Sequence, residues 1–400
     1  MAVGAPPSWH GVALAACRTW FDARSVLATP SAPPLPPPAI EQPAPRQVSY
    51  GLVTGRAAPG AKVVVVAANG RVLAVRKLRG RRIWLRVPLP TGDLILRVST
   101  IAPGGRRSSH VVEDVFGLPA TSRPTFARAR NDPRLARELR ALARGYRGTA
   151  GVYVQSLTSG VGASWNAKAR FPAASTLKLA IATAVLAEHS GIPPPGSYLG
   201  ALLREMIVPS DDAAANALLV WLGGSTSSGG LRVNALMRSL GLVDSVMYGG
   251  YLVRTLSGGI PVRVDRQPAF GVGKYTTARD MTSLWRAIWL ASEDRGPLRR
   301  ARAGFTRGDA RYLLWILAHV RDLPKLDRRV SSQDDVAVLH KAGWISAARH
   351  DTGLVFWRGG VFVAGVMTWD GNGAGPSSDR LAGRVADRAL RRFRALARHG

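Results

Sequence analysis

The order of helices and strands expected between residues 119 and 400 restricts the fold of this chain more than any other feature. The pattern predicts a basic amphipathic helix at 133–145, followed by a strand at 151–156. Helical segments then continue to about residue 320, before two strands within 352–369 and a final helix at 378–397. Helices at both ends, flanking an antiparallel sheet with further helices between, predict an α+β domain of two lobes. A binding site is expected in the cleft between the sheet and the helical lobe.

Two segments of different character precede this domain. Residues 1–47 are dense in proline, which favours an extended spacer over a packed element, the alternative being a disordered tail without a role. Residues 48–118 alternate short apolar runs with turn signals such as Asn69-Gly70, a pattern typical of a small antiparallel β-sandwich. This second pattern resembles the immunoglobulin-like modules of secreted bacterial enzymes and predicts a spacer or binding module. The chain is therefore expected to have three parts, 1–47, 48–118 and 119–400.

The charge of the chain is strongly positive, with 55 lysines and arginines against 25 acidic residues. Only seven of the 55 are lysines, and the arginines are spread along the chain without a zinc-finger or RNA-binding motif. We therefore expect no nucleic-acid partner, although such a charge favours salt-sensitive attraction to a membrane surface or to anionic cell-wall polymers. No apolar run approaches the ~20 residues of a membrane helix.

The single cysteine, Cys17, excludes an intramolecular disulfide and a cysteine-built zinc site. No pattern calls for a metal or an organic cofactor. The residues before Cys17, Leu14-Ala15-Ala16, resemble the bacterial lipobox that precedes a lipidated cysteine, but no Lys or Arg comes before them. We expect an extracellular or cell-envelope location, reached through lipidation at Cys17 or through a leader upstream of Met1.

Residues 171–182 contain the first candidate catalytic pair. Pro172 favours extended chain at Phe171, and an Ala- and Leu-rich helix is expected over 174–189. Ser175 would lie at the start of this helix, with Lys178 one turn later on the same face. A hydroxyl there has an amine within reach and backbone N–H groups at the positive end of the helix dipole. Ser175 is therefore a candidate nucleophile, the alternative being that it only caps a buried helix.

Two later segments supply further polar groups. Ser210, Asp211 and Asp212 form a turn before a new helix, and Lys341, Ala342, Gly343 and Trp344 follow one another on an expected strand. In this order the three segments resemble the serine penicillin-recognising family, which includes the class A β-lactamases and related penicillin-binding proteins. The family's usual motifs are Ser-x-x-Lys, Ser-Asp-Asn and Lys-Thr-Gly. Residues 275–281 resemble its Thr-Thr-bearing helix start, and the resemblance covers roughly residues 125–400.

The resemblance implies the β-lactamase/transpeptidase-like fold and a role for each residue. Ser175 would attack the carbonyl of a β-lactam or of a D-Ala-D-Ala-like amide, Lys178 would accept its proton, and Ser210 would protonate the leaving nitrogen. The backbone N–H groups of Ser175 and Trp344 would form the oxyanion hole. The implied substrate-binding residues are Asp212, Lys341, Ala342, Gly343 and Trp344. Asp211 is expected to hold the turn, and His340 and His350 are expected to have structural or solvent-facing roles.

The chain also departs from the family pattern. Asp212 replaces an asparagine, so an amide donor becomes a carboxylate that repels a substrate oxygen unless it is protonated or turned away. Ala342 replaces a threonine or serine whose hydroxyl helps to hold the substrate carboxylate. The 35 residues between Ser175 and Ser210 are fewer than is usual and indicate a trimmed helical lobe.

The largest departure from the family pattern concerns the general base that activates water to hydrolyse the acylated serine. Class A enzymes carry a glutamate before the Thr-Thr helix, but the only glutamate between Asp212 and Lys341 is Glu293, which follows it. Asp265 is the nearest acidic candidate and is flanked by two arginines. Loss of a general base typically costs about 10²–10⁴-fold in rate. Acylation without efficient release is therefore expected, which is penicillin-binding behaviour.

The leading hypothesis is a monomeric serine acyl-enzyme hydrolase that resembles class A β-lactamases and acts on β-lactams through Ser175. One alternative is a slow DD-peptidase or penicillin-binding envelope protein whose substrate is a peptidoglycan stem peptide. Another is a binding module that kept the scaffold without its chemistry.

Overall fold

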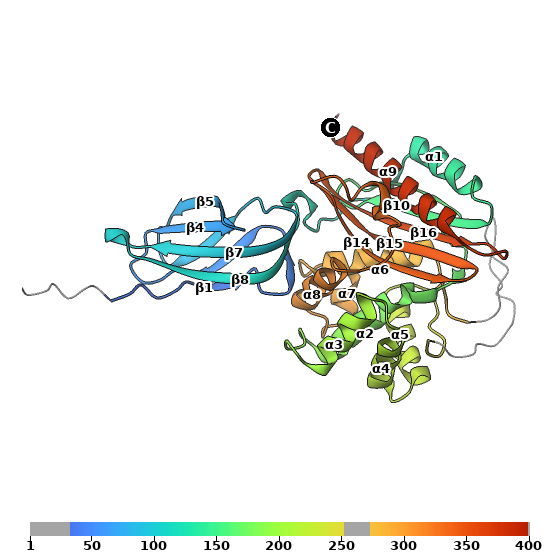
Figure 1. The fold of residues 1–400 in the computed structure, drawn as a ribbon, viewed down its shortest axis with the longest axis horizontal. Coiled ribbons are helices and arrows are strands. Elements are labelled where there is room, and N and C mark those ends of the chain that lie inside the picture. The colour runs from blue at the N-terminus through green and yellow to red at the C-terminus, as the bar shows by residue number, and fades with distance from the viewer. Residues whose placement is uncertain (1–32, 252–272, 399–400) are drawn as a thin grey trace, which may run out of the picture. The chain divides into compact units, whose positions relative to one another are not determined.

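Two β-sheets with facing apolar sides build the N-terminal region. The computed structural model describes residues 33–251 and 273–398 of the chain. One sheet has the order β1-β3-β6, with the strands β1 (Ala39–Gln42), β3 (Leu52–Arg56) and β6 (Arg82–Arg86). The other has the order β2-β8-β7-β4-β5, with the strands β2 (Gln47–Ser49), β8 (Arg107–Gly117), β7 (Gly92–Ile101), β4 (Val63–Ala68) and β5 (Arg71–Lys77). Val53 and Ile83 of the first sheet share one hydrophobic cluster with Val64 and Leu96 of the second. Figure 1 shows the strands of this region.

The turn between β4 and β5 lies at Asn69-Gly70. Both residues have positive φ, 47° and 81°. A two-residue hairpin turn of this kind needs positive φ at both positions, which asparagine and glycine adopt at low cost. The all-β arrangement expected from such turn signals is confirmed.

The proline-rich segment ends earlier than expected. Residues 39–42 form β1, which pairs antiparallel with β3, and Leu35 is buried in the core of the two sheets. The interpretation of residues 1–47 as an unpacked spacer is therefore wrong for this part. An edge strand tolerates neighbouring prolines because its outer N–H groups need no partner, and Ile40 packs against the core despite the proline content around it.

A six-stranded sheet forms the centre of the following region. Its order is β14-β15-β16-β10-β11-β9, with the strands β14 (Ala337–Ile345), β15 (Ala348–Trp357), β16 (Gly360–Trp369), β10 (Thr149–Ser156), β11 (Val161–Trp165) and β9 (Arg130–Asn131). The helices α1 (Pro133–Arg144) and α9 (Pro376–Arg398) lie side by side on one face (Figure 1). Leu139 of α1 and Phe393 of α9 bury their side chains against this sheet. The terminal helices and the hairpin within 352–369 are confirmed.

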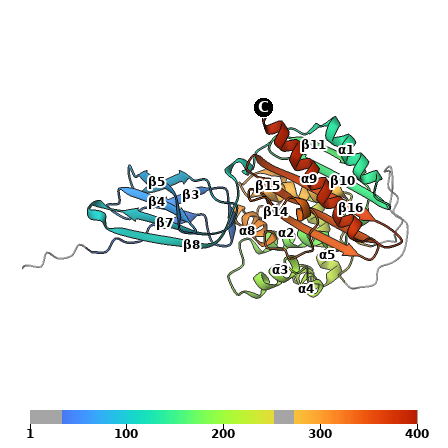
Figure 2. The same cartoon turned by 45° about the horizontal axis from the view of Figure 1, so that its top comes forward.

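The opposite face of the sheet carries the remaining helices (Figure 2). Helix α6 (Ala278–Ala291) contacts β10, β15 and β16 directly. The helices of this lobe besides α6 are α2 (Lys178–His189), α3 (Tyr198–Ile207), α4 (Asp212–Gly223), α5 (Thr226–Ser239), α7 (Gly296–Ala301) and α8 (Arg307–Leu317). Short 3-10 helices are η1 (Pro103–Gly105), η2 (Ala120–Ser122), η3 (Ala174–Leu177) and η4 (Asp327–Arg329). Among the described residues, no helix combines the length and apolarity needed to cross a membrane. The expected two-lobed α+β fold is confirmed.

Candidate active site

The candidate nucleophile lies on a tight turn before α2. The expected helix from residue 174 begins as the 3-10 turn η3 and becomes α-helical at Lys178. Ala174, just before Ser175, has φ 46°, a left-handed conformation uncommon for a residue with a side chain. Such backbone strain persists only where the surrounding structure holds it, and it clusters at functional sites. Ser175 itself is half-buried.

A two-stranded sheet holds this turn from one side. The strands β12 (Phe171–Pro172) and β13 (Tyr275–Thr276) are antiparallel, and the Ala173 N–H donates to the Lys274 carbonyl at 2.9 Å. This pairing joins two segments about a hundred residues apart in the sequence. It brings Lys274 next to the Ser175 turn.

Strand β14 approaches the turn from the other side at Gly343. A Cβ placed on Gly343 would lie 2.7 Å from the Ser175 nitrogen and 2.8 Å from the Thr176 nitrogen, closer than a Cβ can come. Only glycine permits this approach, which brings the backbone of β14 against the start of η3. Of its neighbours, Ala342 is buried, whereas the Trp344 side chain is 62% exposed.

Ser210 lies on the turn between α3 and α4 with φ 65°. The Asp211 N–H donates to the Glu205 carbonyl at 3.0 Å, and the Asp211 carboxylate caps α4 by accepting the Ala214 N–H at 2.6 Å. Asp211 therefore holds the turn, as expected. The turn presents both the carbonyl and the hydroxyl of Ser210 to the two lysines of the site.

Lys178 is fully buried and has two polar partners on this turn. Its Nζ donates to the Ser210 carbonyl and lies 2.5 Å from Asp212 Oδ1. Burial lowers the pKa of Lys178, and the Asp212 carboxylate opposes that shift. Asp212 is thus turned toward Lys178 in an ion pair. Lys178 is thus engaged by Asp212 and Ser210. In the described part of the chain the Ser175 hydroxyl forms no hydrogen bond, either to Lys178 or to another residue.

Lys341 is the second buried ammonium of the site. Its Nζ lies 2.9 Å from Ser210 Oγ and 3.4 Å from Asp322 Oδ2. Burial, helped by the charge of Lys178, lowers the pKa of Lys341 to about 8 against the opposing effect of Asp322. Since Lys178 Nζ is 3.4 Å from the same hydroxyl, Ser210 Oγ lies within reach of both ammonium groups. This arrangement can pass a proton between them.

Three residues of the site escaped the sequence analysis: Lys274, Tyr251 and Asp322. The Tyr251 ring lies between two cations, with Lys178 Nζ and Lys274 Nζ each 4.7 Å from its centroid. Burial raises the pKa of Tyr251 above its ordinary range and lowers that of Lys274. The scarcity of lysine could have drawn attention to Lys274, which directly precedes the 275–281 segment. No comparable signal marks Tyr251 or Asp322.

The two histidines have structural partners. His340 Nδ1 lies 2.9 Å from the Asp351 carboxylate. His350 donates from Nε2 to the Pro172 carbonyl at 2.6 Å and accepts the Thr368 N–H at Nδ1. Burial lowers the pKa of His350 to about 4, so this ring is neutral at pH 7. Both rings are buried and hydrogen-bonded within the fold, so neither faces the solvent.

The acidic candidates for deacylation divide into two cases. Glu293 forms an ion pair with Arg311, whose guanidinium also donates to the Ser292 carbonyl. It is therefore tied into the helical lobe at the end of α6. Asp265 lies outside the described residues, as does Cys17.

Comparison with known proteins agrees with this fold. The sequence model of the Beta-lactamase enzyme family matches residues 134–191 and 188–393. Among solved structures, PBP-A is 20% identical with a TM-score of 0.55, over 68% of this chain and 100% of its own. A class A β-lactamase from Mycobacterium abscessus is 18% identical with a TM-score of 0.51, over 65% of this chain and 99% of its own. An ancestral class A β-lactamase is 21% identical with a TM-score of 0.51, over 65% and 100%.

A comparison with curated proteins found no match. The structural likenesses, at about one identical residue in five, establish a common fold. The family match extends over more than half of the sequence. The chain therefore belongs to the β-lactamase enzyme family.

Proposed function

We propose that this protein is a serine enzyme that opens β-lactam amides through Ser175 and releases the acyl group slowly. The observation that carries the proposal is the convergence of Lys178 and Lys341 on Ser210, beside the strained turn that bears Ser175. Two buried lysines near one hydroxyl are costly for folding alone, because burial penalises each ammonium.

Acylation would proceed by transfer of one proton around this group. Ser175 Oγ forms a bond to the amide carbon while its proton passes to a neutral Lys178. The C–N bond then breaks, and the leaving nitrogen takes a proton from Ser210, which is reprotonated from Lys341 or Lys178. The carbonyl oxygen would accept hydrogen bonds from the N–H groups of Ser175 and Trp344. The close approach of β14 at Gly343 to the Ser175 nitrogen supports this placement of the two groups.

Substrate binding would rest on charge. Lys341 attracts the carboxylate found on β-lactams, although Ala342 offers no hydroxyl beside it. Asp212 cannot donate a hydrogen bond to the substrate amide while ionised, and its ion pair with Lys178 raises the proton affinity of the base. Both features reduce the rate of acylation relative to a site with the usual Asn and Thr.

Slow release is the second half of the proposal. Between Asp212 and the Thr-Thr helix the chain has no glutamate, and Glu293, which follows the start of that helix, is engaged by Arg311. A missing general base slows ester hydrolysis by about 10²–10⁴-fold. One PBP-A mutant is described as an acyl-enzyme complex with penicillin G. That description supports the idea that such an ester can be held on this fold.

A burst assay tests the proposal. On mixing with a chromogenic cephalosporin, the protein should release a burst of product close to one equivalent per chain, followed by a much slower steady rate. The burst arises because acylation precedes a slower hydrolysis. A steady rate as fast as the initial phase would indicate an efficient β-lactamase. No reaction with the cephalosporin or with a D-Ala-D-Ala peptide would indicate a binding module.

Replacing Asp212 with asparagine should speed acylation at neutral pH. The change removes the charge that raises the pKa of Lys178, so this pKa falls further and the neutral amine is present at lower pH. The acid limb of the acylation rate should therefore move to lower pH. The new amide donor should add about fivefold to the rate, the equivalent of one net hydrogen bond of ~1 kcal/mol.

The matched control is Asp211→Asn, because Asp211 influences Lys178 only through charge and less strongly than Asp212. Its pH profile should move in the same direction by a smaller amount. An acid limb that stays in place or moves to higher pH in Asp212→Asn would contradict the role given to this ion pair.

A further inference from the structure

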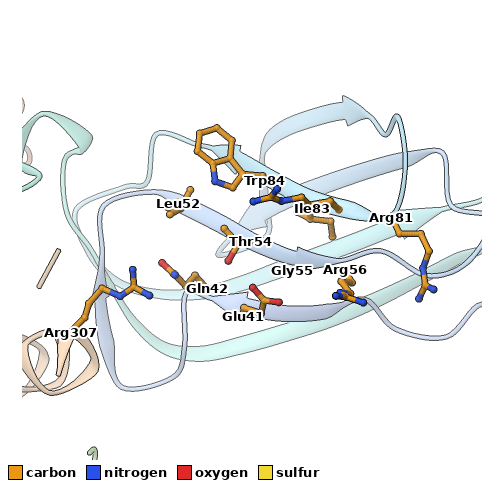
Figure 3. A pocket seen from close by; sticks show the side chains of 11 residues that line it. Glu41, Gln42, Leu52, Thr54, Gly55, Arg56, Arg81, Ile83, Trp84 and Arg307 are labelled. Atoms are coloured by element: carbon orange, nitrogen blue, oxygen red, sulfur yellow. The ribbon is translucent and has the colours of Figure 1, made fainter. Parts of the chain in front are cut away.

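A groove on the N-terminal β region lies apart from the Ser175 site. It occupies about 660 Å³ over the outer face of the three-stranded sheet. Figure 3 shows Glu41 and Gln42 of β1 and Thr54 and Arg56 of β3 along this groove, with Trp84 of β6 at its side. Its volume is in the range of sites that hold small ligands or short polymer segments.

The strand register places like charges opposite each other on this face. Arg56 of β3 pairs with Arg82 of β6, and Thr54 pairs with Trp84. Directly opposed side chains have Cβ atoms about 4.5–5.5 Å apart, and like charges at that spacing are destabilising. The outward side of the sheet therefore carries an electrostatic cost that a bound anion would remove.

Three arginines of the groove are available to a ligand, whereas a fourth, Arg307 of α8, pairs with Asp294. In the part of the chain that the structure describes, Arg56, Arg81 and Arg82 form no ion pair, and the only side-chain bond among them joins Arg81 to the Ala57 carbonyl. Residues 35–118 contain thirteen lysines and arginines but only four acidic residues. A guanidinium group binds a carboxylate or phosphate through paired N–H donors.

Trp84 adds an apolar contact surface beside these charges. Its side chain is 56% exposed although tryptophan is usually buried, and the Arg86 guanidinium lies 5.7 Å from its ring centroid. Leu52 lines the same face. A flat exposed ring flanked by polar groups suits the apolar side of a sugar, whereas the carboxylate of Glu41 disfavours a dense polyphosphate backbone.

We infer that this groove binds an acidic polysaccharide, a sugar chain that carries carboxylate groups. Trp84 stacks on one sugar ring, and the opposed pair Arg56 and Arg82 binds the carboxylate of the neighbouring ring. Glu41 and Gln42 contact sugar hydroxyls. The site would hold the enzyme on an anionic polymer surface, and it does not depend on any chemistry at Ser175.

Binding of the full-length protein to immobilised carboxymethyl-dextran tests this inference, with unmodified dextran as the uncharged match. We expect retention on the carboxylated polymer alone at ~0.15 M salt, where charges beyond about 8 Å are screened. Arg56→Gln/Arg82→Gln and Trp84→Ala should each weaken binding by at least about tenfold, as removal of a central contact does. Thermal unfolding of each variant checks that the fold is intact.

The control is Arg71→Gln/Arg97→Gln, which removes the same charge from exposed positions on the other sheet of the region. It should weaken binding by no more than about twofold, which screened charges allow. Equal losses in both double variants would overturn the assignment, because binding would then follow net charge. Equal binding to plain dextran, no binding, or tighter binding to duplex DNA or phosphatidylglycerol vesicles would also overturn it.

Discussion

Replacing Ser175 with alanine is expected to abolish covalent reaction with benzylpenicillin. The wild-type protein should gain the mass of one penicillin, and Ser175→Ala should gain none at any time. Ser175 is the hydroxyl on the strained turn, next to the N–H groups that would hold the oxyanion. Loss of the nucleophile in subtilisin costs on the order of 10⁶-fold in kcat, so the residual rate here should not be measurable.

Two further serine variants make this result specific. Ser283 lies on the exposed side of α6, and its hydroxyl bonds only to the Arg279 carbonyl, so Ser283→Ala should react like the wild type. Ser210→Ala should react more slowly and still acquire the adduct, because Ser210 transfers a proton and forms no bond to the substrate. Adduct formation in Ser175→Ala at the wild-type rate would assign the nucleophile elsewhere.

Replacing Lys178 with methionine should slow acylation by about 10²–10⁴-fold, the usual contribution of a general base. Methionine preserves much of the buried aliphatic volume but cannot accept a proton. The substitution removes the ammonium that pairs with Asp212, yet the Asp212 side chain is 31% exposed and can be solvated. The rate constant of acylation, measured from the growth of the adduct, gives the size of the effect.

Lys168→Met is the matched control, because Lys168 is exposed and lies outside the site. It should leave the acylation rate unchanged. Lys341→Met should mainly weaken the apparent affinity for penicillin, since Lys341 would bind the carboxylate. A near wild-type rate in Lys178→Met, combined with a collapsed rate in Lys341→Met, would transfer the role of base to Lys341.

The fold could be predicted largely from local patterns. The periodicity of apolar residues predicts the amphipathic helix 133–145, and the turn signal at Asn69-Gly70 predicts the strands on either side of it. Both signals depend on residues close in sequence. The end of the proline-rich segment could not be found this way. Ile40 is held in β1 by its pairing with β3, a tertiary contact that overrides the local preference for extended spacer.

The site residues that lie within the sequence motifs could be predicted. Ser175, Lys178, Ser210 and Lys341 follow from the resemblance of their ordered motifs to the penicillin-recognising family, and the structure brings them together. Lys274 reaches the site through the pairing of β12 with β13, a contact between distant segments that no local sequence pattern predicts. The orientation of Asp212 depends likewise on the buried ammonium of Lys178, so its ion pair could not be foreseen from the Ser-Asp-Asp turn alone.

The intact mass of the full-length protein, followed over time after a pulse of benzylpenicillin, tests the central claim most directly. Excess penicillin is removed once the adduct has formed, and the fraction of acylated chain is then measured at intervals. We predict one adduct per chain, located on Ser175 by peptide mapping, that persists long after the penicillin is gone. Rapid return to the unmodified mass would contradict slow release, and the absence of any adduct or turnover would contradict the assignment of Ser175 as nucleophile.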